Sequence, residues 1–194
     1  MFLTGLALYS KGDLEGAAVK FRETLKLDSE FFVAAFYLGS CYAAGGRDRE
    51  AVGAWRTSLV TESDAPFIYT LLSDAFLRLK DANRALDILK EASTLWPQDD
   101  QVQLRLGTAL ALAGRTDEAI PVLDTYLTRN PTDHERIFIV LQAIYQTRKA
   151  GRSIKSPAED KALFERYATM YTAAKGPQGG IVEAWRKFIE AGAR

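Results

Sequence analysis

The chain has 194 residues, of which 47% are hydrophobic and 26% charged, and its 25 basic residues balance 25 acidic ones. Nucleic-acid-binding proteins usually carry a basic excess, because neutralising phosphates supplies much of their affinity, so this balance predicts no nucleic-acid partner. No apolar run approaches the roughly 20 residues that cross a bilayer, which argues against membrane insertion, and a single cysteine, Cys41, excludes an internal disulfide.

The first residues, MFLTGLALYSKGD, already show the apolar spacing of a helix. They contain no basic segment and no small-residue cleavage site, so we do not interpret them as a signal peptide. We expect the chain to be a segment of a longer protein, whose targeting signals would then lie elsewhere. Localisation stays open between the cytoplasm and the periplasm.

Small and bulky residues recur along the chain with a step of 34 residues. We look for such a period before any local pattern, because a repeat decides the fold class. Four series show it: Gly5, Gly39, Ser73 and Gly107; Leu8, Tyr42, Phe76 and Leu110; Ala17, Ala51, Ala85 and Ala119; and Phe21, Trp55, Leu89 and Leu123.

Each repeated stretch predicts two helices joined by a tight turn. In the third stretch, DAPFIYTLLSDAFLRLK and DANRALDILKEASTLWP each place their apolar residues on one helical face. A short side-chain oxygen caps the start of a helix, and glycine adopts without strain the left-handed conformation that ends one. We therefore expect N-caps at Asp13, Asp48, Asp81 and Thr116, and left-handed turns at Gly12, Gly46 and Gly114.

The pattern L-G-x-x-Y, then glycine, A-x-x-x-F and proline resembles the tetratricopeptide repeat. It is carried by LGSCY…G…AVGAW and LGTAL…G…AIPVL…NP, with similar patterns in LLSDAF…ALDIL…WP and GLALYSKG…AAVKF. The resemblance implies an all-α fold, a right-handed α-solenoid of stacked helix-turn-helix repeats. We place one domain over residues 1–194, with repeats at 1–31, 32–65, 66–99 and 100–133, a degenerate fifth unit at 134–175 and a capping helix at 180–192.

Gly39 lies inside a helical pattern, where glycine costs ~1 kcal/mol against alanine. We expect it to let the first helix of its repeat approach Ala51 of the second, with Tyr42 and Trp55 filling the space beyond. A phosphate-binding loop is excluded, because the chain has neither the G-x-x-x-x-G-K-[ST] spacing nor a preceding strand pattern.

The period breaks in the fifth unit, where the basic segment TRKAGRSIKSP is inserted. We expect Arg148, Lys149, Arg152 and Lys155 to form a solvated connector, with docking of an anionic partner as the alternative. The next helix is expected to bury Leu163, Phe164, Tyr167, Met170 and Tyr171. The last helix has one apolar face and is expected to cover the end of the array with Ile181, Val182, Trp185, Phe188 and Ile189.

Few residues suggest chemistry. His134 is the only histidine, and neither a nucleophile nor a set of metal ligands accompanies it in the sequence. Cys41 is interpreted as a small buried apolar residue. We expect no catalysis, no cofactor and no metal in this segment.

The resemblance implies that the first helices of the repeats line a concave groove that binds an extended peptide or a partner helix. The groove positions are Phe2, Leu6, Phe36, Tyr37, Ser40, Thr70, Asp74, Arg78, Gln101, Arg105, Thr108, Phe138, Gln142 and Tyr145. Our hypothesis is that Phe36 and Tyr37 anchor an apolar side chain, while Arg78 and Arg105 bind an acidic or amide-rich part of the ligand.

Two alternatives stay open at these positions. Phe36 and Tyr37 would otherwise pack on a neighbouring repeat, and Asp74 would neutralise Arg78 one helical turn away. The lysine and asparagine clamp of chaperone-binding relatives is missing, because those positions hold Phe2, Leu6, Ser40, Thr70 and Asp74.

The leading hypothesis is a non-catalytic protein–protein interaction module with a scaffold or assembly role, whose partner is a protein or a peptide. A self-assembly module is the first alternative, forming a homo-oligomer through apolar residues at the N-terminal end of the array. An accessory domain of a larger enzyme or transport system is the second.

Overall fold

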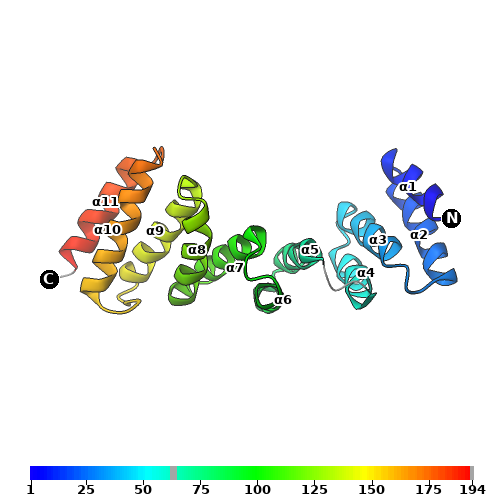
Figure 1. Ribbon diagram of the computed structural model, residues 1–194, viewed down its shortest axis with the longest axis horizontal. Coiled ribbons are helices and arrows are strands. Elements are labelled where there is room, and N and C mark those ends of the chain that lie inside the picture. Colours follow the sequence, from blue (N-terminus) through cyan, green and yellow to red (C-terminus); the bar gives the residue numbers. More distant parts are fainter. Residues whose placement is uncertain (62–64, 193–194) are drawn as a thin grey trace. The chain divides into compact units, whose positions relative to one another are not determined.

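A computed structural model describes residues 1–61 and 65–192, and every regular element in that part of the chain is an α-helix (Figure 1). The expected all-α helical repeat fold is confirmed. The chain divides into two compact units, Met1–Trp96 and Pro97–Arg194. Residues 62–64, which the prediction places near the end of the second repeat, lie outside the described part.

The first unit consists of three helix pairs, whose members pack against each other and against the next pair. They are α1 (Phe2–Ser10) with α2 (Leu14–Leu27), α3 (Phe32–Ala44) with α4 (Asp48–Thr61), and α5 (Pro66–Arg78) with α6 (Ala82–Leu95). The second unit consists of α7 (Asp100–Leu112) with α8 (Thr116–Arg129), α9 (His134–Lys149) with α10 (Pro157–Ala173), and a final α11 (Gly179–Ala191).

The turns within the helix pairs use a left-handed residue, as the sequence predicts. Gly12, Gly46 and Gly114 have φ values of 81°, 73° and 72°. In the third pair the same position holds Lys80, which adopts φ 59° although a side chain makes this conformation unfavourable. Both kinds of turn close with the same backbone bond: Arg47 N donates to Tyr42 O at 2.8 Å, and Asp81 N donates to Phe76 O at 2.8 Å.

Two of the four predicted N-caps are present. Asp13 accepts a hydrogen bond from the backbone N–H of Gly16 at 3.0 Å, and Asp81 accepts one from that of Arg84 at 3.1 Å. These carboxylates satisfy amides that the first helical turn leaves unpaired.

The other two predicted N-caps are wrong, since α4 begins at Asp48 itself and Arg115, not Thr116, occupies the N-cap of α8. Both side chains bond to other helices instead. The Asp48 carboxylate accepts from Arg78 of α5 at 2.8 Å, and the Thr116 hydroxyl lies 2.8 Å from that of Thr147 of α9.

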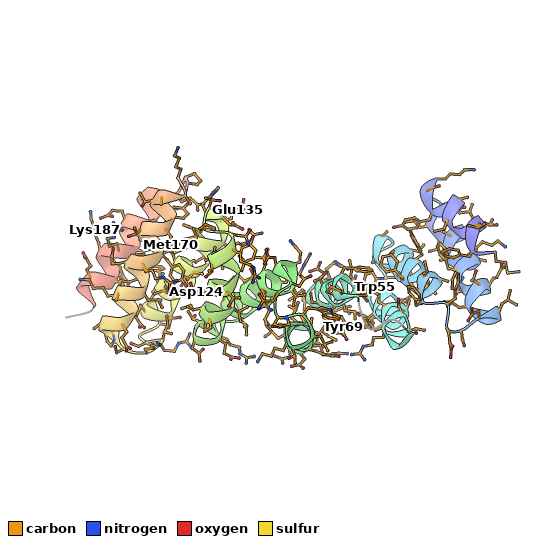
Figure 2. All side chains as sticks on the ribbon, in the orientation of Figure 1. Trp55, Tyr69, Asp124, Glu135, Met170 and Lys187 are labelled. Atoms are coloured by element: carbon orange, nitrogen blue, oxygen red, sulfur yellow. The ribbon has the colours of Figure 1, made fainter. Side chains whose placement is uncertain are left out.

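Close approach of α3 and α4 explains Gly39, but the residue that it accommodates differs from the prediction. A Cβ at Gly39 would lie 2.5 Å from Cδ1 and Nε1 of Trp55, so the indole, rather than Ala51, occupies this space. Trp55, labelled in Figure 2, is 1% exposed, and its indole N–H donates to Phe36 O at 3.2 Å. The missing side chain thus gives room to the largest residue of the first unit's core.

The core of the second unit contains residues from α8, α9, α10 and α11. Tyr167 and Tyr171 are buried in it, as predicted. The Tyr167 hydroxyl donates to Asp124 of α8 at 2.9 Å. The last helix, α11, buries Val182 and Ile189 against this core. It does not bury its whole apolar face, because Ile181 and Phe188 stay exposed.

The inserted segment after α9 is held in place rather than wholly solvated. The Asp160 carboxylate, 1% exposed, accepts hydrogen bonds from the backbone N–H groups of Ile154 and Lys155 at 3.1–3.2 Å. Arg148, predicted in the solvated connector, has a side chain that is only 12% exposed and lies 3.8 Å from that carboxylate. Its guanidinium also donates to the carbonyl oxygen of Arg152 at 3.2 Å.

Candidate functional site

The predicted groove residues lie on the first helices of the pairs, and each compact unit is considered by itself. In the first unit they are Phe36, Tyr37 and Ser40 on α3 and Thr70, Asp74 and Arg78 on α5. In the second unit they are Gln101, Arg105 and Thr108 on α7 and Gln142 and Tyr145 on α9.

Aromatic rings dominate the first unit's share of this surface. The Tyr37 ring stacks on Phe21 of α2 at 5.6 Å between centroids and meets Tyr9 of α1 edge-on at 5.4 Å. Phe36 contacts Tyr37 at 5.3 Å and Phe67 of α5 at 5.4 Å. Both Phe36 and Tyr37 are half-buried, so each packs on a neighbouring helix pair and still presents part of its ring to solvent.

The sequence interpretation missed two exposed apolar residues on α5. Phe67 is 53% exposed although it contacts Phe36, and Leu77 is also exposed. The signal was available, because Phe67 stands one period of 34 residues before Gln101, which is on the predicted list. Thr70, which is on that list, is 8% exposed and donates its hydroxyl to Phe67 O at 2.8 Å. It therefore offers a ligand little surface.

Arg78, at the edge of this face, already forms an ion pair within the fold. The Arg78 guanidinium lies 2.7 Å from the Asp48 carboxylate of α4, whose hydrogen bond, together with the nearby charge of Asp74, raises the pKa of Arg78. The expected neutralisation by Asp74 is thus a secondary contribution. Because Arg78 is about half exposed, this pair stabilises the fold weakly and leaves the cation within reach of a ligand.

The second unit's share of the surface is more polar. Gln101 and Gln142 are exposed, and Arg105 and Thr108 are half-buried. Tyr145 is covered on one side, because its ring stacks on Trp185 of α11 at 5.0 Å with an interplanar angle of 14°.

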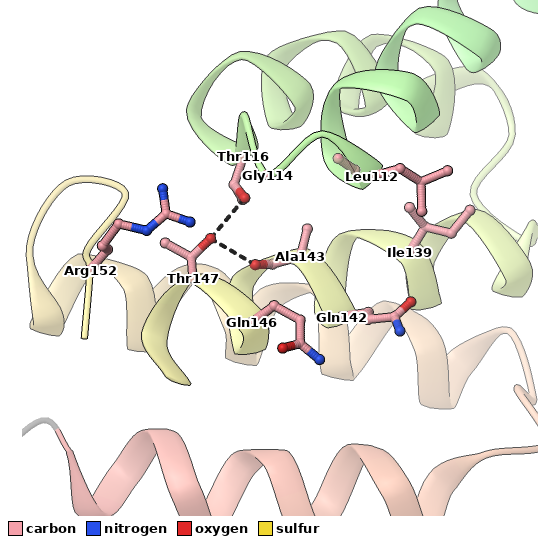
Figure 3. Close-up of a pocket in the computed structure, with 10 residues that line it drawn as sticks. Leu112, Gly114, Thr116, Ile139, Gln142, Ala143, Gln146, Thr147 and Arg152 are labelled. Carbon is pink, nitrogen blue, oxygen red and sulfur yellow. Dashed lines mark hydrogen bonds between the residues drawn. The ribbon is translucent and has the colours of Figure 1, made fainter. Parts of the chain in front are cut away.

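A hollow of about 190 Å³ opens between α7 and α9 on this face (Figure 3). Leu112, Ile139 and Ala143 contribute apolar surface to it, and Gln142, Gln146 and Arg152 contribute amide and guanidinium groups. The residues that line it are Ala111, Leu112, Gly114, Thr116, Ile139, Gln142, Ala143, Gln146, Thr147 and Arg152. The two threonine hydroxyls are paired with each other, and Thr147 also donates to Ala143 O at 2.9 Å, so they are not available to a ligand.

His134 and Cys41 are the two residues that the sequence analysis considered for chemistry. His134 is half-buried, and its ring lies 6.4 Å from that of Tyr171. Cys41 is buried, and burial raises the pKa of its thiol to about 11, which disfavours the reactive thiolate. Within residues 1–61 and 65–192, no group of three or more histidine, cysteine or acidic side chains is arranged to hold a metal ion.

Comparison with known proteins decides the family. Two family models, both described as tetratricopeptide repeat, match residues 1–65 and 76–144, which together exceed half of the chain. The chain belongs to the tetratricopeptide repeat family. Repeats of this family serve in general as protein-interaction modules, and nothing in the described part of this tetratricopeptide repeat protein indicates catalysis.

Solved structures of other tetratricopeptide repeat proteins share the fold. The chain is similar to YrrB, titled "a TPR protein with an unusual peptide-binding site", with a TM-score of 0.70 and 19% identity over 96% of this chain and 90% of that one. It is similar to MamA with a TM-score of 0.69 and 20% identity over 88% of this chain and 91% of that one. At these identities the similarity concerns the fold alone.

Among curated proteins, the chain is 23% identical over 111 residues to Tetratricopeptide repeat protein 21 homolog of Caenorhabditis briggsae. The match covers 57% of this tetratricopeptide repeat chain and 8% of that protein, so the chain spans a small part of its relative. No helix in the described residues is both long and apolar enough to cross a membrane.

Proposed function

We propose that this chain is a protein-interaction module that binds extended segments of a partner protein along the exposed faces of the first helices within each compact unit. It performs no chemistry itself and acts as a scaffold or assembly element, on its own or as an accessory domain of a longer protein. The observation that carries the proposal is the exposure of large apolar side chains on helices whose other faces are already buried.

The first helix α5 shows this most clearly. Its buried face contributes Ile68, Leu72 and Phe76 to the core, while Phe67 and Leu77 remain exposed on the other side. Packing within the fold accounts for part of Phe67, whose ring meets Phe36 at 5.4 Å, but not for the exposed half of that ring or for Leu77. Contact with a partner would cover both. The adjacent Arg78 supplies a cation, and aromatic and arginine side chains are the types that contribute most to binding at interfaces.

The test is a screen of the purified chain against an array of short peptides, followed by fluorescence anisotropy with the peptides that bind. We expect Phe67→Ala to weaken peptides that bind the first unit, and Arg105→Ala to weaken those that bind the second, by about fivefold or more in each case. Leu95→Ala is the matched control, because Leu95 is as exposed as Phe67 but lies on the second helix α6. Circular dichroism verifies that each variant is folded. Unchanged affinity in both test variants would place the binding surface elsewhere and overturn the proposal.

A second candidate function, self-association, is favoured by α1. Leu3 is 77% exposed and Met1 beside it is also exposed, which gives this helix an apolar outer surface. Contact with a second copy of the chain would cover it. Light scattering over a range of concentrations distinguishes the two functions: association that Leu3→Glu abolishes supports this candidate, and a monomer at every concentration eliminates it.

A further inference from the structure

We infer that the hollow between α7 and α9 binds an internal stretch of a partner protein in which an aliphatic side chain is followed closely by an aspartate or glutamate. This inference rests on the proposed function and specifies the ligand chemistry of one part of the same surface. It is carried by three features of the second unit: an apolar wall, a pair of side-chain amides and an arginine at the mouth.

The apolar wall suits an aliphatic side chain. Leu112 at the end of α7 is 79% exposed, and Ile139 and Ala143 of α9 face it across the hollow (Figure 3). A ligand methyl or isobutyl group placed between them would remove apolar surface from water on both sides. The space is too small for a helix of the partner but sufficient for one side chain.

The two amides suit the backbone of an extended peptide. Gln142 and Gln146 are exposed, lie one helical turn apart on α9 and both line the hollow. Residues four apart on a helix are separated by about 6 Å along its axis. Alternate residues of an extended chain are separated by about 6.6 Å. Each side-chain amide can therefore bond a peptide group on the same edge of a strand that runs along α9. Such bonds use only main-chain groups and need no chain terminus, so an internal segment satisfies them.

Arg152 lines the hollow and brings a positive charge to it. Arg152 lies in the inserted segment, and its Nη2 is 3.8 Å from the position that a Cβ on Gly114 would occupy. Asp117 lines an adjoining hollow with Arg152, but these two described residues form no ion pair. The backbone on either side of Arg152 is fixed, because Arg148 binds its carbonyl oxygen and buried Asp160 binds the amides of Ile154 and Lys155.

This fixation is the reason to assign a binding role to the insertion. A connector needs no buried ion pair, whereas fixing the backbone that carries Arg152 lowers the ordering cost when a ligand binds. The repeat pattern is interrupted at this segment, so the arginine is a feature of this chain and not of the 34-residue period.

The experiment uses the whole chain and an array of randomised short peptides, acetylated at the N-terminus and amidated at the C-terminus. We expect selected peptides to combine Leu, Ile or Val with an Asp or Glu one to three residues later. In anisotropy titrations, Arg152→Gln should weaken the selected peptide about fivefold, the scale of a partly exposed ion pair. Lys155→Gln is the matched control, because it removes the same charge from the same segment while Lys155 lines a different hollow. Replacing the peptide's acid by its amide should weaken wild-type binding equally and should have no effect on Arg152→Gln.

Several outcomes would overturn the inference. Equal losses of affinity in Arg152→Gln and Lys155→Gln would indicate general charge attraction. A screen that does not select an acidic residue would contradict the role of Arg152. Tighter binding when the peptide's C-terminal amide is replaced by a free carboxylate would show that the site prefers a chain end. If peptides bind and respond to Phe67→Ala or Arg105→Ala but not to Arg152→Gln, this inference fails while the proposed function stands. If no peptide binds the wild-type chain, both fail.

Discussion

Alanine substitutions at two helical glycines of the same repeat should have opposite effects on stability. Gly39 lies on α3 against the buried Trp55, and Gly53 lies on the exposed side of α4, where a Cβ would meet nothing within 4 Å. Helix propensity alone favours alanine at either position by about 1 kcal/mol. The difference between the two variants therefore isolates the packing of Gly39 against the indole.

The cost at Gly39 follows from the contact distances. An added Cβ would lie 2.5 Å from two atoms of the Trp55 ring, about 1 Å closer than ordinary contact, so the ring must move. Overpacking of this kind costs about 1–3 kcal/mol. Movement would also weaken the 3.2 Å bond from the indole N–H to Phe36 O, which adds about 1 kcal/mol for a buried donor. After subtracting the propensity gain, we expect Gly39→Ala to lower the free energy of unfolding by about 2 kcal/mol.

Thermal and urea unfolding of the two variants, followed by far-ultraviolet circular dichroism and tryptophan fluorescence, measures this difference. Gly53→Ala should raise Tm and Gly39→Ala should lower it, with a separation of roughly 6–12 °C for a chain of this size. If Gly39→Ala stabilises the protein as much as Gly53→Ala does, the close approach of α3 to Trp55 is not the reason for glycine, and the packing argument is refuted.

The remaining predictions concern buried polar groups. Thr147→Val should cost about 1–2 kcal/mol in urea unfolding because it leaves the Thr116 hydroxyl without its partner, and the double variant with Thr116→Val should cost less than the sum of the two single ones. Asp160→Asn should loosen the segment after α9, seen as faster amide exchange at Ile154, with a stability loss of about 2–4 kcal/mol; unchanged exchange would show that the carboxylate does not hold the segment. Cys41 should resist thiol reagents at pH 8 until the protein is unfolded. Burial raises the pKa of this thiol from 9.0 to about 11, so the thiol ionises at lower pH in the unfolded chain than in the folded one. The neutral buried thiol therefore contributes its full share of stability below pH 9, and that share is lost as the pH rises to 11. Cys41→Ala should remove this component from the pH dependence of the free energy of unfolding.

The helices, their order and their turns could be predicted from the sequence because they depend on neighbours within a few positions. The 34-residue period fixed which residues face the core of each pair, and glycine at three of four turn positions marked the left-handed residue. Lys80 shows the limit of that signal, since the backbone of the repeat imposes the same conformation on a residue that does not favour it.

The candidate surface could be predicted only in part. The period identified the helices that carry it, and Phe36, Gln142 and Arg78 do retain exposed surface. It also marks Phe67, one period before Gln101, as a surface position, although Phe67 is absent from the predicted list. It did not reveal that Thr70 is buried, because the packing around a side chain depends on contacts with other helices that residue type alone does not report.

By itself the sequence determined the repeat, because one local pattern written four times specifies helix pairs that must stack to bury their apolar faces. Tertiary structure alone decided the partners of the polar side chains. Asp48 and Thr116 bond to neighbouring helices instead of capping their own, and Arg148 turns inward to the carboxylate of Asp160. A polar group takes the partner that folding brings within about 3 Å, and across separate helices that distance is set by packing and not by spacing along the chain.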